Sequence, residues 1–170
     1  MRTVGRVATV LAIAGCAVTA SARGQEPASE GWRPFEGSWS AAGERHTLPV
    51  ERGEVAAIVR LSGALVLKTG DGLSRGFRAE AIGFDAGRGA GVGRAVWTDE
   101  RGDRIFSDIA GAPGRDRREV NGTITGGTGR YAGIAGSYRF TWDYLMPADD
   151  GRIQAGAVSL AGRYRREGGR

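Results

Sequence analysis

The segment "YAGIAGSYRFTWDYLM", residues 131–146, alternates between two kinds of side chain, and this alternation limits the fold more than any other feature of the sequence. Apolar or aromatic residues occupy the even positions Ile134, Tyr138, Phe140, Trp142, Tyr144 and Met146, whereas the odd positions include Ser137, Arg139, Thr141 and Asp143. A period of two residues is that of a β-strand with one buried face. The segment therefore predicts a long strand and excludes a helix.

Weaker alternation recurs in seven other segments, which are separated by short turns. These segments are residues 37–48, 56–67, 74–84, 92–100, 103–111, 118–125 and 152–166. Glycine supplies 30 of the 170 residues, well above the average of about 7%, and it marks turns such as the hairpin predicted at Arg101-Gly102. Eight short strands predict an all-β fold, a single closed antiparallel barrel, because closure leaves no exposed strand edge.

The N-terminal residues have the features of an export signal. Arg2 and Arg6 precede an apolar run that is too short for a membrane-spanning helix, and Ala20-Ser21-Ala22 supplies small residues for cleavage. The mature protein is therefore expected to be periplasmic or secreted. The expected organisation is a signal peptide at 1–22, a polar lead-in at 23–34, a β-barrel domain at 35–166 and a tail at 167–170.

Cys16 allows a second interpretation of the same signal. Ile13-Ala14-Gly15-Cys16 resembles the bacterial lipoprotein box, in which the cysteine is acylated and becomes the new N-terminus. Two alternatives stay open: free release after Ala22, or a lipid anchor at Cys16 in the cell envelope, which would be the protein's one contact with a membrane. Cleavage after Ala22 would leave 148 residues without a cysteine, excluding disulfides and thiol chemistry.

Charge and residue types exclude several kinds of partner. Without Arg2 and Arg6, 22 basic residues face 19 acidic ones, and the basic residues are scattered. Nucleic-acid binding requires a concentrated basic face, so we expect no nucleic-acid partner. A single histidine makes a zinc site unlikely to form, and the acids Asp99, Glu100 and Asp103 lack the spacing of a calcium loop. We interpret those acids as a solvated turn and expect neither a metal nor a cofactor.

The stretch "ITGGTGRYAGIAG", residues 124–136, fits the pattern G-x-G-x-x-A of dinucleotide-binding loops. Such a loop must lead into a helix whose N-terminus holds the pyrophosphate. Here it leads into the alternating strand. Gly126, Gly127 and Gly129 are therefore interpreted as a hairpin turn, and Gly133 and Gly136 as points where a strand bends around a barrel.

The same stretch resembles the Gly-Gly-Thr-Gly-x-aromatic signature of the allene oxide cyclase and dirigent barrels. The matching positions are Gly126, Gly127, Thr128, Gly129, Tyr131 and Gly136. The resemblance implies an eight-stranded antiparallel barrel that binds an apolar small molecule and steers its cyclisation or coupling. It also makes a homo-oligomer plausible. The catalytic acids and arginines of the plant enzymes have no assignable counterparts here, so no catalytic residue is predicted.

Candidate ligand-binding residues are those of unusual character on the predicted strands. Arg78 and Glu80 share a face with Ile82 and Phe84; if that face points inward the pair could bind a polar ligand group, and if it points outward it is a surface ion pair. Alternation does not decide, because the other face is apolar too. Aromatic residues expected to line the barrel are Trp97, Tyr138, Trp142 and Tyr144.

Three functions are compatible with these features. The first is an exported barrel that binds a small apolar or amphipathic molecule without transforming it. The second is an isomerase, cyclase or stereochemistry-guiding barrel, which would act mainly by holding a reactive substrate in one shape. The third is a filled barrel with a structural or interaction role in the cell envelope. A packed interior would favour the third, and a cavity the first two.

Overall fold

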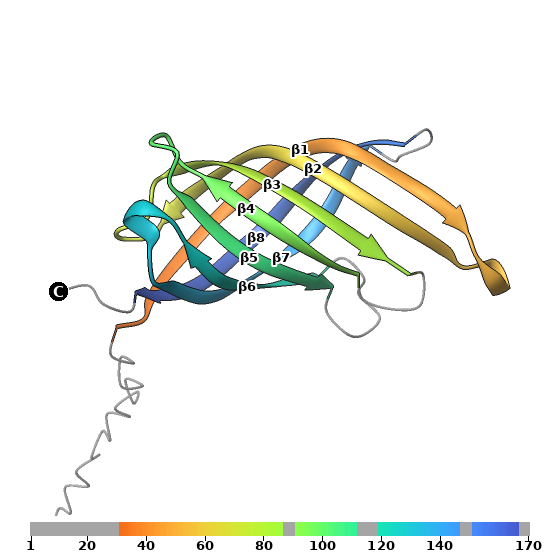
Figure 1. The fold of residues 1–170 in the computed structure, drawn as a ribbon. Coiled ribbons are helices and arrows are strands. Elements are labelled where there is room, and N and C mark those ends of the chain that lie inside the picture. The colour runs from red at the N-terminus through yellow and green to blue at the C-terminus, as the bar shows by residue number, and fades with distance from the viewer. Residues whose placement is uncertain (1–30, 87–90, 112–118, 147–150, 167–170) are drawn as a thin grey trace, which may run out of the picture.

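The computed structural model describes residues 31–86, 91–111, 119–146 and 151–166, and its main elements are eight β-strands (Figure 1). The strands are β1 (Arg33–Pro49), β2 (Val55–Thr69), β3 (Gly76–Asp85), β4 (Val92–Thr98), β5 (Arg104–Gly111), β6 (Glu119–Gly127), β7 (Ile134–Met146) and β8 (Arg152–Arg166). Two short 3-10 turns, η1 (Glu51–Gly53) and η2 (Gly129–Tyr131), complete the described elements. The predicted signal peptide, Cys16 and the predicted tail lie outside the described residues.

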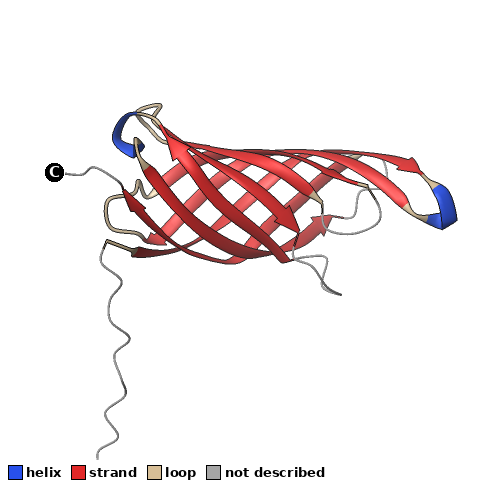
Figure 2. Cartoon of the chain, turned by 60° about the horizontal axis from the view of Figure 1, so that its bottom comes forward, coloured by secondary structure: helices blue, strands red, loops and turns tan. Residues whose placement is uncertain are grey.

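Every strand pairs antiparallel with the next one in the sequence, and β8 pairs with β1 to close the barrel (Figures 1 and 2). The predicted all-β fold and closed eight-stranded barrel are therefore confirmed. No helix among the described residues has the length and apolar character needed to cross a membrane.

Two turns differ in detail from the sequence prediction. The predicted two-residue hairpin at Arg101-Gly102 is one residue longer, because the amide of Asp99 donates to the carbonyl of Asp103 at 3.0 Å and leaves Glu100 in the loop. Gly102 has a φ of +85°, as this loop length requires. The strand predicted from Tyr131 begins later, at Ile134, since Tyr131 ends η2 and Gly133 takes a φ of +72°.

Small residues on the inner wall make room for large ones. The ring of Tyr138 lies where a Cβ on its pairing partner Gly122 would be, only 2.1 Å away. Buried alanines also lie on β1, β2, β3, β4 and β8: Ala41, Ala57, Ala79, Ala81, Ala95, Ala155 and Ala157. Matching small residues to large ones in this way fills the interior of a narrow barrel.

One part of the interior is filled by aromatic rings. Trp97 packs edge-on against Phe35 at 6.0 Å between ring centroids and lies 5.0 Å from Tyr138. Phe77 lies 5.8 Å from Tyr131, whose side chain is fully buried. This packed cluster occupies the half of the barrel that ends at η2.

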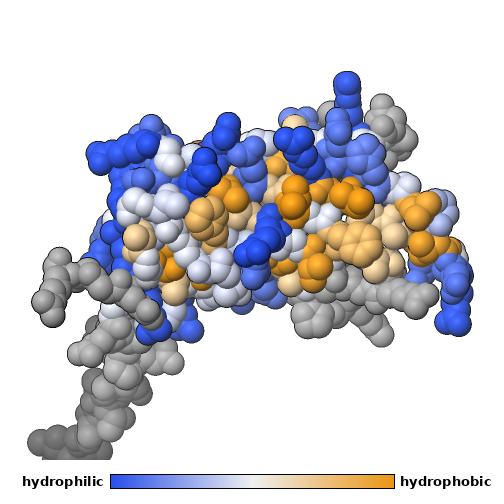
Figure 3. All heavy atoms as spheres, in the orientation of Figure 1, coloured by the Kyte–Doolittle hydropathy of each residue, from blue (hydrophilic) through white to orange (hydrophobic). Residues whose placement is uncertain are grey.

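The outer wall carries apolar side chains beside its charged ones. Ile58, Phe84 and Val92 stand next to one another across β2, β3 and β4 in the strand register, and all three are exposed. Figure 3 shows such apolar side chains over the barrel wall on the face seen in Figure 1. Phe84 and Val92 also border the pocket described next.

Candidate ligand-binding pocket

An apolar pocket of about 190 Å³ opens at the end of the barrel opposite η2. Its inner walls come from interior-facing side chains of six strands, β1 to β3 and β5 to β7, and its mouth from the end of β3 and the start of β4. The lining residues are Trp39, Val59, Leu61, Ala81, Gly83, Phe84, Asp85, Gly91, Val92, Ile109, Ala110, Gly111, Val120, Phe140 and Trp142.

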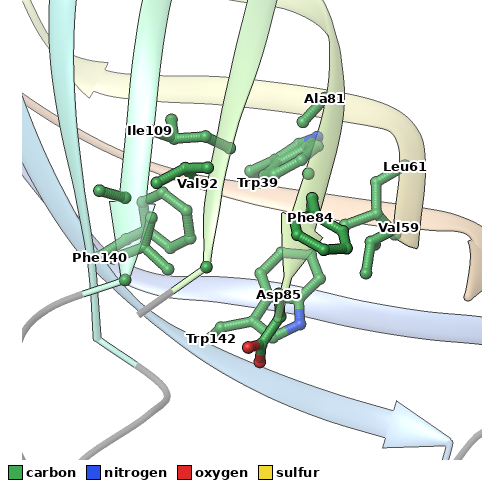
Figure 4. Close-up of a pocket in the computed structure, with 15 residues that line it drawn as sticks. Trp39, Val59, Leu61, Ala81, Phe84, Asp85, Val92, Ile109, Phe140 and Trp142 are labelled. Carbon is green, nitrogen blue, oxygen red and sulfur yellow. The ribbon is translucent and has the colours of Figure 1, made fainter. Parts of the chain in front are cut away.

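Three aromatic side chains shape the pocket. The rings of Trp39 and Trp142 are 5.3 Å apart with their planes inclined by 47°, and Phe140 meets Trp39 edge-on at 6.4 Å. Trp39 projects from β1 and the other two from β7, because alternation places residues two apart on the same face of a strand. Figure 4 shows these rings around the space between β1, β7 and the ends of β3 and β4.

Polar groups are sparse in this pocket. Asp85, at the last position of β3, is the one charged side chain among the lining residues that the structure describes, and it is partly exposed at the mouth. The indole nitrogen of Trp39 is deeper: it is buried and has no hydrogen-bond partner. An isolated buried donor of this kind is uncommon, since most buried polar groups are paired.

The opposite end of the barrel is closed by the glycine-rich stretch that resembled a nucleotide loop. Its turn η2 places Tyr131 inward, and the amide of Ser74 donates to the Tyr131 hydroxyl at 3.2 Å. Gly129 has a φ of +52°, and a Cβ there would lie 1.8 Å from the carboxylate of Asp103. Gly129 lies in this turn as predicted, whereas Gly126 and Gly127 belong to the end of β6. Strand β7 follows the turn where a nucleotide loop would need a helix.

A buried ion pair fixes this turn to the β4–β5 hairpin. Arg130 Nη2 lies 2.6 Å from Oδ2 of Asp99, whose side chain has no solvent exposure. The amides of Arg101 and Asp103 donate to Asp99 Oδ1 at 2.8 and 3.0 Å. Burial acts to raise the pKa of Asp99, but the hydrogen bonds from Arg130 and the two amides outweigh it, so that the pKa lies below its usual range.

Glu100 extends the ion pair towards the surface. It accepts from the hydroxyl of Ser74 at 2.6 Å and from Arg130 at 2.8 Å, and these contacts lower its pKa. The interpretation of Asp99, Glu100 and Asp103 as a solvated acidic turn is wrong for Asp99, which is buried and paired. No group of three or more metal-ligating side chains occurs among the residues that the structure describes.

A second polar pair lies inside the barrel wall. The hydroxyls of Ser107 and Tyr138 are 2.7 Å apart, and both residues are buried. Burial raises the pKa of Tyr138 to about 12, although the contact with Ser107 acts to lower it. Each hydroxyl therefore satisfies the other, and the pair is neutral at physiological pH.

The predicted ligand-binding residues fall in different places. Arg78 and Glu80 point outward and form an exposed ion pair, with Arg78 Nη2 3.2 Å from Glu80 Oε2, so the outward alternative holds and neither lines the pocket. Trp97 and Tyr138 belong to the packed aromatic cluster. Trp142 lines the pocket. The backbone of Tyr144 lies in β7, while its side chain is outside the described part of the structure.

Trp39, Leu61 and Phe140 are pocket residues that the sequence analysis did not single out as ligand-binding candidates. The alternation along its strand could have identified Phe140 as an inward-facing residue. For Trp39 the signal was the spacing of Phe35, Gly37, Trp39 and Ala41, which places both aromatic rings on one face. Because small residues lie on both faces of this strand, the spacing predicts the inner face only weakly.

Comparison with known proteins adds one structural likeness. No family model matches the chain, and no curated protein is significantly similar to it. Among solved structures it is similar to the pterocarpan synthase dirigent protein GePTS1, with 10% identity, coverage of 84% of this chain and 90% of that chain, and a TM-score of 0.47. So low a similarity carries no argument about activity. The strand pairing itself shows a closed, eight-stranded antiparallel barrel.

Proposed function

We propose that this protein binds a small apolar molecule in the open pocket formed by Trp39, Leu61, Phe140 and Trp142. The observation that carries the proposal is the uneven filling of the barrel. Aromatic rings pack one half of the interior, whereas the other half leaves an apolar hollow of about 190 Å³ open at its mouth. Concave apolar sites with few polar groups are typical of ligand pockets, and a purely structural barrel has no need of one.

The volume limits the ligand. Pockets for drug-sized molecules measure about 300 to 1,000 Å³, and an engineered cavity of about 150 Å³ holds benzene. At about 190 Å³ this pocket suits one aromatic ring with a short substituent, or the corresponding end of a longer molecule.

Charge limits the ligand further. Asp85 is the one charged side chain among the described lining residues, and it already has an interaction partner. The other described lining side chains are apolar, and a carboxylate or phosphate placed among them would lose its hydration at a high cost. The part of the ligand that enters the pocket is therefore neutral.

Binding without chemical transformation suits this pocket better than catalysis. A general acid or base usually shows a displaced pKa caused by its site. Among the described residues, the groups with displaced pKa values are Asp99, Glu100, Arg130, Tyr131 and Tyr138, and each lies outside the pocket lining. Because the N-terminal sequence predicts export, we place this binding function outside the cytoplasm.

Fluorescence titration tests the proposal, since Trp39 and Trp142 line the pocket. Toluene and anisole are suitable probes, with sodium benzoate as the anionic counterpart. We expect saturable quenching by the two neutral probes and much weaker binding of benzoate. Equal binding of benzoate, or no saturable binding of any probe, would contradict the proposal.

A matched pair of variants tests whether the ligand binds in this pocket. Ala81→Leu adds three carbon atoms inside it, whereas Ala64→Leu makes the same change at an exposed position on β2. We expect Ala81→Leu to abolish binding and Ala64→Leu to leave it unchanged, with both variants giving the wild-type circular dichroism spectrum. Loss of binding in both, or in neither, would place the site elsewhere.

A further inference from the structure

Trp39 has a feature that packing alone does not explain. The residue is only 7% exposed, and its indole nitrogen is buried without a hydrogen-bond partner. An indole N–H is a donor only, so it needs an acceptor when it leaves water. Leaving a buried donor unpaired is more costly than the net gain from a typical hydrogen bond.

Among the described residues, the surroundings of Trp39 supply no side-chain acceptor. Phe140 and Trp142 pack against its ring, and Figure 4 shows its nitrogen on the side facing Ala81. Asp85, the one carboxylate of the pocket, lies towards Trp142 in the same view. The donor therefore lies in the apolar wall of the pocket beside Ala81, and because the nitrogen has no exposed surface in this conformation, a ligand oxygen reaches it through a small shift of the Trp39 ring.

A buried water would be a poor partner for this donor. A gap of about 10 Å³ also borders Trp39 and is at the lower limit for one water molecule. Apart from Trp39 itself, its lining side chains with polar atoms are Trp97 and Tyr138, and the Tyr138 hydroxyl is already paired with Ser107. A buried water normally makes about three hydrogen bonds, which this gap does not offer.

We propose that Trp39 determines the specificity of the pocket by donating its indole N–H to an uncharged oxygen acceptor at the inner end of the ligand. This inference rests on the proposed binding function and refines it. The ligand class is a neutral aromatic ketone, aldehyde or ether of about one ring, inserted with its oxygen towards Trp39. A hydrocarbon of the same shape fits the pocket but leaves the donor unpaired.

Isosteric probe pairs test this directly on the full chain. Acetophenone and α-methylstyrene differ by exchange of a carbonyl oxygen for a methylene group, and anisole and ethylbenzene by exchange of an ether oxygen for a methylene group. After correction for the transfer of each probe from water to an alkane, we expect the oxygen compounds to bind about threefold to tenfold more tightly. Trp39→Phe removes the donor and should abolish this preference, whereas Trp142→Phe changes the same pocket and should keep it.

Indole N–H signals in a ¹⁵N-correlated NMR spectrum give a second readout that needs no affinity. The protein has four tryptophans, and the signal missing from Trp39→Phe identifies that of Trp39. We expect acetophenone to move this proton downfield and α-methylstyrene not to do so.

The outcomes separate the two proposals. If both members of each pair bind equally and the Trp39 proton does not respond to acetophenone, the role of Trp39 is overturned while the binding function stands. If no probe binds, the binding function fails and the inference fails with it. If Trp39→Phe does not fold, the probe pairs still decide with the wild-type protein.

Discussion

Arg130 and Asp99, 31 positions apart in the sequence, form an ion pair in which Arg130 Nε and Nη2 lie 2.7 and 2.6 Å from the same carboxylate oxygen. The Asp99 side chain is fully buried, and that of Arg130 is 30% exposed. The pair joins the glycine-rich turn to the β4–β5 hairpin. It therefore fixes two connections at the closed end of the barrel.

Removal of the cation should be strongly destabilising. Arg130→Ala leaves the carboxylate of Asp99 buried without its main partner, and breaking a buried pair in this way costs about 3 to 5 kcal/mol. Since Arg130 is partly exposed, we expect a loss of about 3 kcal/mol, measured by urea unfolding. Arg78→Ala, which breaks the exposed pair with Glu80, is the control and should cost about 0 to 1 kcal/mol. Equal losses in both variants would contradict a structural role for the Arg130 pair.

The pH dependence of stability should depend on Asp99. Its pKa is lower in the folded protein than in the unfolded chain, where it is about 3.9. A depressed pKa contributes stability at pH values above the unfolded value, and this contribution is lost as the pH falls through the folded value. The difference in unfolding free energy between the wild type and Asp99→Asn should therefore be constant from about pH 7 to 5 and shrink below about pH 4. A difference that persists unchanged to pH 2 would exclude this linkage.

Two tyrosines should lose their hydroxyl protons at a higher pH than an exposed tyrosine does. Burial raises the pKa of both Tyr131 and Tyr138 to about 12, so their contribution to stability is complete below about pH 10 and is lost as the pH rises towards 12. Phenolate absorbance should show a step near pH 12, accompanied by unfolding. Tyr138→Phe should make that step smaller, and a Tyr138 signal complete by pH 10 would contradict its burial.

The N-terminal signal predicts one of two masses. Expressed with its full sequence in a bacterial host, the protein should have the mass of residues 23–170 if it is released after Ala22. If it is lipid-anchored, it should begin at an acylated Cys16, and Cys16→Ser should then abolish the anchor. An intact chain beginning at Met1 would contradict export in either form.

Strand positions were predictable because each strand has one buried face. The alternation over 131–146 gave the long strand β7, and its late start at Ile134 depends on the positive φ of Gly133, which alternation does not encode. Which face of β3 points into the barrel was not predictable. Its interior face carries Phe77, Ala79 and Ala81, whereas larger apolar residues such as Phe84 lie outside, so hydrophobicity alone does not distinguish the two faces.

The pocket was less predictable than the barrel for a related reason. Trp142 was expected to line the interior, but whether an inner aromatic residue fills the barrel or borders a cavity depends on its neighbours across the strands. Trp97 and Tyr138 pack together, while Trp142 lines a pocket whose other lining residues include the small residues Ala81, Gly83 and Gly91. The pairing of Asp99 with Arg130 likewise depends on two turns meeting at one end of the barrel, which no local pattern shows.

Among the described residues, the aromatic cluster fills the part of the barrel next to η2, and the pocket opens towards the other end. If the proposed binding is correct, arrival and departure follow the same route in opposite directions, and a second molecule cannot enter before the first has left. A molecule longer than the pocket can insert only one of its ends, and its remainder stays in the surrounding fluid. The barrel would then distinguish molecules by the end that they insert and would accept many different groups attached to that end.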